Sequence, residues 1–171
     1  MMTYLHRYES PLGTILMEGD GEAVCALWFE GQGGVGSGPE AEPVPQGEEP
    51  AVFSQADRWL DAYFAGEDPG PVPPLRLEGT AFRRRVWEVL QTIPYGETVT
   101  YGQIARMLAE ERGIERMSAQ AVGGAVGHNP VSLMVPCHRV VGSKGELTGY
   151  AGGIERKAAL LELERGAAAT Y

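Results

Sequence analysis

A cysteine, a histidine and an arginine stand side by side in the stretch VPCHRVVG, residues 135–142. Cys137 is one of two cysteines in the 171-residue chain, and the other is Cys25. A free thiol has a pKa of about 8.5, and a nearby imidazole or cation lowers that pKa and makes the sulfur a nucleophile. Three interpretations of Cys137 are open: a buried packing residue, a metal ligand, or a nucleophile activated by His138.

The position of His138 limits how it can act on the thiol. In an extended segment neighbouring side chains point to opposite faces, so contact needs a turn at Pro136 and Cys137 or a bridging water. A catalytic base also needs a third group to orient it, and we select Glu164, in the closing helical segment. This relay predicts a pKa of Cys137 well below the usual value.

Metal chemistry fits the sequence poorly. The chain has two cysteines and three histidines, with no CxxC or HxxxH spacing that would hold a tetrahedral ion, so we expect no metal and no cofactor. Two distant cysteines form no disulfide framework, which favours a cytoplasmic location. No apolar run reaches the roughly 20 residues of a membrane span, and MMTYLHRYES has no features of a secretory signal.

Charge is divided unevenly along the chain, whose net charge is −9. Residues 1–78 hold three Lys and Arg against fourteen Asp and Glu, whereas residues 79–171 hold eleven against nine. The second half could therefore face phosphates, and the acidic first half has no expected role on DNA. Arg83, Arg84 and Arg85 form a local basic cluster, for which a solvated helix face is the alternative.

The first half predicts a small sheet with one helix. Strand-like runs cover residues 3–8, 13–18 and 23–29, and Pro- and Gly-containing turns between them indicate an antiparallel meander. Residues 31–50, rich in Gly, Pro and Glu, predict a mobile loop. In residues 51–67 helical spacing predicts a buried face of Phe53, Ala56, Trp59, Leu60 and Tyr63. DPGPVPP then marks a boundary between domains 1–74 and 75–171.

The sequence predicts that the second half is predominantly helical. Helices are expected after Thr80, after Thr100, from Ser118 to Asn129, and over residues 154–164, with SLMVPCHRVVG extended between the last two. The two central helices resemble a helix-turn-helix. The second of them is nearly bare of side chains, which permits close approach to either a neighbouring helix or a nucleic-acid groove.

Beyond single residues, the string AVGGAVGHNPVSLMVPCHRVVG, with GYAGG downstream and SPLG and PYGETVTYGQIA upstream, resembles the O6-alkylguanine-DNA alkyltransferases. The resemblance implies an α+β fold, with a ribonuclease-H-like N-terminal sheet domain and a winged-helix-like C-terminal domain. It implies irreversible alkyl transfer from guanine O6 to the protein's own cysteine, once per molecule and without a cofactor, and leaves thymine O4 open as a second alkyl donor. The implied partner is double-stranded DNA containing alkylated guanine, bound by a monomer with no membrane association.

The resemblance also implies roles for individual residues. Cys137 would accept the alkyl group, His138 would act as base through a water, Glu164 would orient His138, and Asn129 would be the hinge before the active-site turn. The implied pocket residues are Tyr101, Tyr150, Leu147, Ala151, Gly152 and Lys157. The implied DNA-binding residues are Gln120, Ala121, Gly123, Gly124 and Arg139, although an ion pair or backbone clamp also fits Arg139.

Two positions depart from the family pattern. Ala151 stands where well-studied relatives have a serine, and the implied contribution there is a backbone N–H. Gln120 stands where better-known members have the arginine that replaces the extruded base. We expect base extrusion to survive with a weaker grip on DNA. Two other functions remain as alternatives: a non-catalytic sensor of alkylated DNA with the same fold, disfavoured by the presence of Cys137, and a Cys–His–Glu hydrolase.

Overall fold

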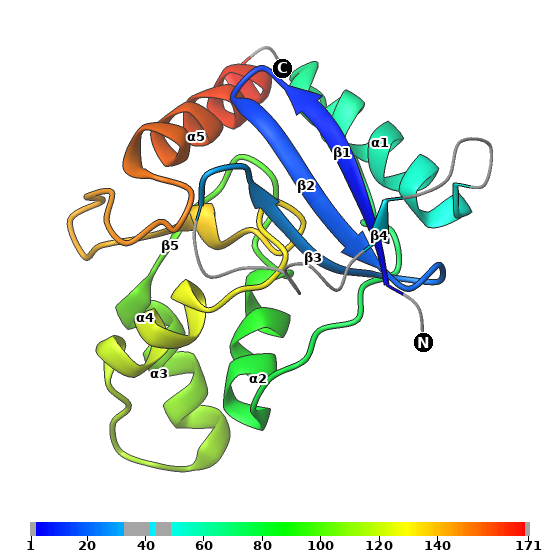
Figure 1. The fold of residues 1–171 in the computed structure, drawn as a ribbon. Coiled ribbons are helices and arrows are strands. Elements are labelled where there is room, and N and C mark those ends of the chain that lie inside the picture. The colour runs from blue at the N-terminus through cyan, green and yellow to red at the C-terminus, as the bar shows by residue number, and fades with distance from the viewer. Residues whose placement is uncertain (1–2, 33–41, 44–48, 170–171) are drawn as a thin grey trace.

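The computed structural model describes residues 3–32, 42–43 and 49–169. Figure 1 shows strands β1–β3 and helix α1 forming one part of the molecule, with α2, α3 and α4 forming the other. The expected α+β class, with a sheet in the first half and helices in the second, is confirmed. Within the described residues no helix combines the length and the apolar character needed to cross a bilayer.

The N-terminal sheet is an antiparallel meander of β1 (Tyr4–Ser10), β2 (Gly13–Gly19) and β3 (Val24–Phe29). A two-residue strand, β4 (Glu42–Pro43), pairs in parallel with β1, which makes the strand order β3-β2-β1-β4. The expectation of a loop over residues 31–50 is therefore wrong at β4. The remainder of that range, apart from residues 31–32 and 49–50, lies outside the described residues.

Helix α1 (Ala51–Phe64) packs against this sheet. The five residues that helical spacing predicts for its apolar face, Phe53, Ala56, Trp59, Leu60 and Tyr63, are all buried. At the start of the helix the Phe53 ring stacks on the ring of His6 in β1, with centroids 4.9 Å apart. The last turn carries Tyr63 into the interior between the two halves of the chain.

The helices of the second half begin where side-chain caps predict. Helix α2 (Ala81–Leu90) follows Thr80, α3 (Tyr101–Arg112) follows Thr100, and α4 (Ala119–Gly127) follows Ser118; each cap accepts from backbone N–H groups of the first turn. Thr100 forms a full capping box with Gln103. The closing helix α5 (Ile154–Ala169) extends past Glu164, where we had expected it to end.

The segment around Cys137 is not extended, contrary to expectation. Residues 132–134 form a turn, and Cys137–Arg139 form a single 3-10 turn, η2. Only β6 (Val140–Val141) is extended, and it pairs in parallel with β5 (Val99–Thr100). The apolar composition that resembled a strand instead reflects burial of the whole segment in the core.

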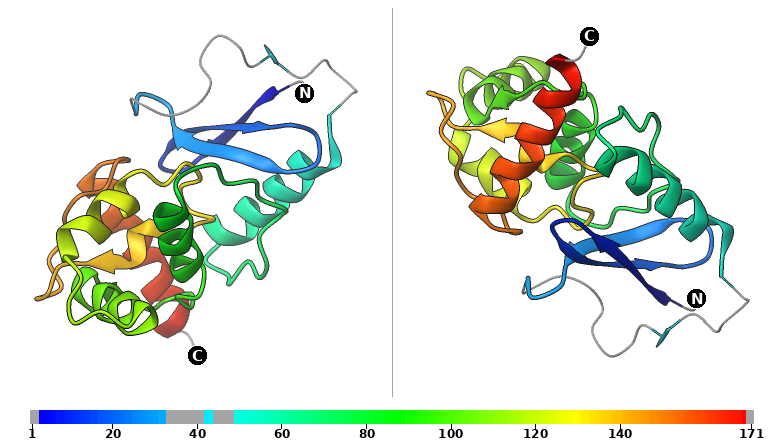
Figure 2. Two further views of the ribbon diagram at one scale, coloured as in Figure 1. Left: turned by 90° about the horizontal axis from the view of Figure 1, so that it is seen from below. Right: turned by 90° about the horizontal axis from the view of Figure 1, so that it is seen from above.

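Strand β3 joins the two halves. Leu27 N–H donates to the Pro130 carbonyl at 2.9 Å, and Ser132 N–H donates to the Leu27 carbonyl at 3.0 Å. Val24 N–H donates to the carbonyl of Pro74, in the linker, at 2.8 Å. Figure 2 shows the two parts from opposite sides, and one continuous hydrophobic cluster includes residues of both. The domain boundary at residues 74–75 stays a prediction.

Candidate active site

Asn129 organises the reversal that leads from α4 to Cys137. Its Nδ2 donates to the Val135 carbonyl at 2.7 Å, and its Oδ1 accepts from Val131 N–H at 3.0 Å. Between these contacts Leu133 adopts a φ of 70°, an uncommon left-handed conformation that the surrounding contacts must hold in place. A buried amide with both ends satisfied therefore ties the end of α4 to the segment before the cysteine.

The Cys137 thiol lies in the interior, with 6% of the residue exposed. Burial raises the pKa of this thiol, and the hydrogen bond with Asn129 and the charge of Lys157 offset the effect only in part. The low thiol pKa expected from the sequence is therefore wrong for this state of the protein, because removing the sulfur from water outweighs the groups around it.

Behind the cysteine, His138 and Glu164 form a buried pair. His138 Nε2 lies 2.5 Å from Glu164 Oε2, and the two side chains are 0% and 1% exposed. Glu164 Oε1 accepts from Arg139 Nε at 2.8 Å and from Gly96 N–H at 3.0 Å. Burial alone would raise the pKa of Glu164, but the hydrogen bonds from His138 and Arg139 and the charge of Arg139 hold it at about 2. The carboxylate is therefore ionised and acts only as an acceptor.

This arrangement determines the state of the imidazole. Because a carboxylate only accepts, His138 Nε2 carries the proton that points at Glu164. Burial lowers the pKa of His138 despite the opposing pull of Glu164, so the ring is neutral at rest. Its Nδ1 is buried without a hydrogen-bond partner. A neutral ring with a bare nitrogen is a base ready to take a proton.

The Arg139 side chain lies in the core beside Glu164. It is 9% exposed, pairs with Glu164, and donates from Nη1 to the Ile93 carbonyl at 2.8 Å. The guanidinium also lies over the ring of Tyr95, 5.7 Å from its centroid. These contacts are the ion pair and backbone clamp expected as the alternative for Arg139, and its direct DNA contact stays a prediction.

Three of the expected pocket residues gather around the sulfur. Tyr101, Tyr150 and Lys157 all lie within electrostatic range of Cys137. Lys157 Nζ donates to the Val140 carbonyl at 2.6 Å and to the Thr148 carbonyl at 2.8 Å. Tyr101 Oη donates to the same Thr148 carbonyl at 3.3 Å. Lys157 thereby ties α5 both to β6 and to the loop that joins β6 to α5.

The other three pocket residues lie in that loop. Leu147 is half-buried, Ala151 is exposed and Gly152 is buried. A Cβ at Gly152 would lie 2.6 Å from the Tyr150 ring and 3.3 Å from Phe29. Glycine at this position therefore lets the Tyr150 ring lie against the backbone, where it forms an edge contact with His138 at 6.5 Å between centroids.

The four α4 residues that are expected to contact DNA lie on one open face of the helix. Gln120, Ala121 and Gly124 are exposed, and Gly123 is half-buried. A Cβ at Gly124 would meet nothing within 4 Å, whereas one at Gly123 would lie 3.8 Å from the Tyr101 ring. The opposite face of the helix packs in the core. The small residues therefore leave the outer face bare, instead of serving helix packing throughout.

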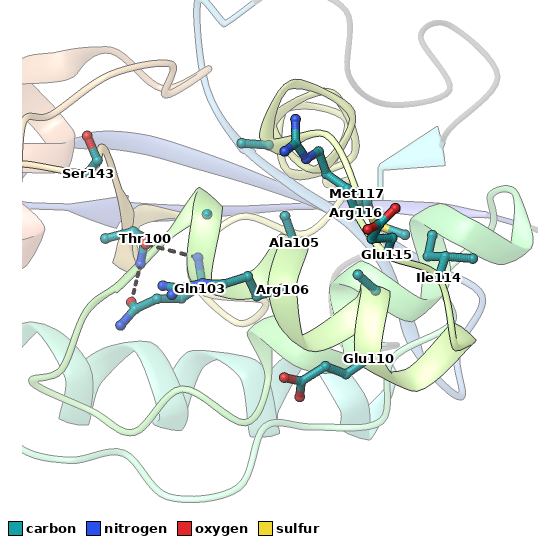
Figure 3. A pocket seen from close by; sticks show the side chains of 13 residues that line it. Thr100, Gln103, Ala105, Arg106, Glu110, Ile114, Glu115, Arg116, Met117 and Ser143 are labelled. Atoms are coloured by element: carbon teal, nitrogen blue, oxygen red, sulfur yellow. Dashed lines mark hydrogen bonds between the residues drawn. The ribbon is translucent and has the colours of Figure 1, made fainter.

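Beside this face lies a hollow of about 730 Å³. Figure 3 shows that it is bounded by α3 and the segment 114–117, and its lining reaches Ala119 at the start of α4. Arg106 and Arg116 contribute two exposed guanidinium groups, and Thr100 and Ser143 contribute hydroxyls. These groups can donate to phosphate oxygens next to the bare helix.

Three groups that hold the relay are not predicted from the sequence. Tyr63 Oη donates to Glu164 Oε2 at 2.6 Å, Gly96 supplies a backbone N–H, and Ile93 supplies a carbonyl. Tyr63 could have been suspected, because a tyrosine on a buried helix face needs a partner for its hydroxyl. The backbone contacts of Gly96 and Ile93 carry no signal in the sequence.

The second cysteine is separate from this site. Cys25 lies in β3, half-buried, with Sγ 3.9 Å from the Ala23 carbonyl, and burial raises the pKa of its thiol. The residues that the structure describes include no group of three His, Cys, Asp or Glu side chains able to hold a metal ion.

Comparison with known proteins agrees with this geometry. Residues 81–166 match the family model described as 6-O-methylguanine DNA methyltransferase, DNA binding domain, and residues 3–72 match its ribonuclease-like domain. The chain belongs to the 6-O-methylguanine DNA methyltransferase family. Both parts of the fold thus correspond to parts of that family, in the same order along the chain.

Individual relatives cover nearly the whole chain. The methylated-DNA–protein-cysteine methyltransferase of Mycobacterium tuberculosis is 44% identical over 167 residues, 98% of this chain and 95% of its own. That of Methanosarcina acetivorans is 42% identical over 163 residues, 94% of this chain and 97% of its own. A crystal structure of the M. tuberculosis protein in complex with DNA superposes with a TM-score of 0.81, over 96% of this chain and 94% of that one.

Proposed function

We propose that this protein repairs DNA by direct reversal, transferring a methyl or other alkyl group from guanine O6 to Cys137. The observation that carries the proposal is the buried relay beside that cysteine, in which neutral His138 donates to Glu164 and keeps Nδ1 bare. The relay compensates for the raised pKa of the thiol, because a base next to the sulfur can remove its proton as the reaction proceeds.

The reaction balances without a cofactor. The thiol proton passes to His138 through a water, and the sulfur attacks the alkyl carbon. A sulfur–carbon bond forms, the carbon–O6 bond breaks, and its electron pair returns to the guanine, which takes up a proton in place of the alkyl group. The thioether has no leaving path, so each molecule acts once. Tyr101, Tyr150 and Lys157 would enclose the base, with the loop of Leu147, Ala151 and Gly152 as the rim.

Double-stranded DNA containing alkylated guanine is the proposed partner, met by a monomer in the cytoplasm. A base inside the stack is unreachable for a nucleophile, so the target nucleotide must be flipped out at a cost of a few kcal/mol. The open face of α4, with Ala121, Gly123 and Gly124, would enter the minor groove, and Gln120 would fill the space left by the base. Asn129 would hold this helix in register with the active-site turn.

The test is stoichiometric transfer from duplex DNA containing O6-methylguanine, followed by intact mass and peptide mapping. We expect one methyl group per protein, on Cys137, and one repaired base per protein molecule. Cys137→Ser should bind the DNA without transfer, and the matched Cys25→Ser should transfer fully. Binding without any mass change would indicate a damage sensor, and repeated turnover on an acyl substrate would indicate a hydrolase; either would overturn the proposal.

A further inference from the structure

The hydroxyl of Tyr63 reaches the relay from the other half of the molecule. Tyr63 lies in the last turn of α1, yet its Oη is 2.6 Å from Glu164 Oε2 and 3.4 Å from His138 Nε2. The residue is fully buried. Its ring stacks on Trp59 at 5.4 Å and meets the Tyr95 ring edge-on at 6.1 Å, both between centroids. This packing holds the hydroxyl against the carboxylate.

Tyr63 and His138 donate to the same oxygen of Glu164. The two donors lie 2.6 Å and 2.5 Å from Oε2, while Oε1 accepts from Arg139 and Gly96. A hydrogen bond to a carboxylate oxygen delocalises its charge and weakens its attraction for a second proton donor. The Tyr63 hydroxyl therefore opposes the tendency of Glu164 to keep His138 protonated.

The Tyr63 hydroxyl acts toward the Glu164 carboxylate only as a hydrogen-bond donor. Burial, and then the charge and hydrogen bond of Glu164, raise the pKa of the Tyr63 phenol, so it stays a donor throughout the physiological range. Titratable and charged groups face His138 from every element packed against it. They are Cys137 and Arg139 in the same turn, Lys157 and Glu164 in α5, Tyr150 in the pocket loop, and Tyr63 in α1. Tyr95 lies next to Tyr63 and Arg139. Among these, Tyr63 is the neutral group that donates to the oxygen bound by His138.

We propose that Tyr63 is a positioning residue of the relay: it fixes the Glu164 carboxylate and limits the basicity of His138, so that the ring is neutral when the Cys137 proton must be accepted. The inference rests on the proposed function, because it concerns the same proton transfer. It also gives the N-terminal sheet and helix a part in the chemistry.

The experiment compares Tyr63→Phe with Tyr8→Phe. Tyr8 is a matched control because its hydroxyl also donates to a carboxylate, Asp61 Oδ1, at 2.6 Å, but this contact between β1 and α1 is exposed. Two quantities are measured as a function of pH: the rate of methyl transfer from O6-methylguanine DNA, and the protonation of the His138 ring by nitrogen NMR without DNA.

In Tyr63→Phe we expect the midpoint of the His138 titration, and the low-pH limb of the transfer profile, to move up by about half a unit to one unit. Transfer at neutral pH should fall about 3- to 10-fold, and Tyr8→Phe should change neither quantity. A simple packing defect would lower thermal stability without moving the His138 titration.

The outcomes separate the two proposals. A wild-type protein that transfers no methyl group would overturn the proposed function, while the NMR titration would still report on Tyr63. Wild-type transfer with an unchanged His138 titration in Tyr63→Phe would overturn the positioning role alone. If Tyr63→Phe does not fold, 3-fluorotyrosine at position 63 keeps the ring and makes a stronger donor; the His138 titration should then move down, and an unchanged titration would contradict the proposal.

Discussion

The relay around Glu164 and the outer face of α4 are constructed in opposite ways. His138 and Glu164 are 0% and 1% exposed, and four donors converge on one carboxylate. On α4, Gln120 and Gly124 are exposed, and the space over Gly124 is open. Proton transfer needs fixed distances, whereas a duplex needs a surface onto which it can close. Substitutions in the relay should therefore damage fold and chemistry together, and those on the outer face of α4 should change DNA binding without disturbing the core.

Glu164→Gln should have the largest effect, because it removes the charge on which the relay converges. Arg139 would lose its ion partner in the core, and a single amide oxygen would replace the two oxygens that accept from four donors. We expect the free energy of unfolding to fall by about 3 kcal/mol and the transfer rate to fall by roughly 100-fold or more. Urea unfolding and single-turnover kinetics measure the two effects. The comparison fails if the substitution slows transfer at full stability.

The same substitution has a defined pH signature. Glu164 has a pKa of about 2 in the folded protein, against an ordinary value of 4.5. A lowered folded pKa means that its stabilisation is present above pH 4.5 and is lost as the pH falls toward 2. The stability difference between wild type and Glu164→Gln should therefore shrink across that window, as measured by urea unfolding at a series of pH values.

Gly152→Ala and Gly124→Ala make the same chemical change in the two regions and should act with opposite signs. At Gly152 the new methyl group would meet the Tyr150 ring at 2.6 Å and Phe29 at 3.3 Å, so we expect a loss of about 1–3 kcal/mol. At Gly124 it would enter open space in a helix, which should add up to ~1 kcal/mol. Thermal unfolding of both variants measures this. Equal destabilisation would show that the face of α4 is not open.

Local signals in the sequence were sufficient for much of the fold. The caps Thr80, Thr100 and Ser118 are short-range chemistry, and each begins a helix at its expected place. The turn at Cys137–Arg139 was not predicted, because an apolar run indicates burial and does not distinguish a strand from a buried turn. The turn depends on the Asn129 amide and on hydrogen bonds with β3, and the second of these contacts joins segments distant in the sequence.

The candidate active site, like the fold, could be predicted from the sequence only in part. Cys137, His138 and Glu164 were selected from a motif and one carboxylate, and the structure brings the imidazole and carboxylate together. The thiol pKa was predicted in the wrong direction, since adjacency to His138 is visible in the sequence and burial of the sulfur is not. Tyr63 was missed because its contact with Glu164 spans 101 residues of chain.

Gln120→Arg tests the α4 side of the comparison. The added charge lies on an exposed residue near the start of the bare helix and should neutralise one DNA phosphate. We expect DNA affinity to rise about tenfold at low salt, and the slope of log affinity against log salt to steepen by about 0.9. The repair rate should rise with it, and thermal stability should stay the same. Unchanged affinity and rate would show that Gln120 does not meet DNA.

The smallest expected effect concerns His6 and His138, whose environments shift their pKa values in opposite directions. His6 in β1 contacts Asp57 at 2.9 Å and Glu49 at 2.8 Å. The hydrogen bond to Asp57 outweighs burial, and with the charges of Asp57 and Glu49 it raises the pKa of His6 above 6.5. Burial lowers the pKa of His138 below 6.5. Stabilisation by His6 is therefore complete below pH 6.5 and is lost as the pH rises through its folded pKa, whereas protonation of His138 below pH 6.5 opposes folding.

His6→Gln isolates the first of these contributions. Because both carboxylate partners are partly exposed, we expect the substitution to cost below about 1 kcal/mol at pH 6, and less at pH 8. Denaturant unfolding at the two pH values measures the difference, and methyl transfer should be unaffected since His6 lies in the sheet away from the relay. A cost that grows with pH would mean that His6 is neutral in the folded protein and that both histidines follow burial alone.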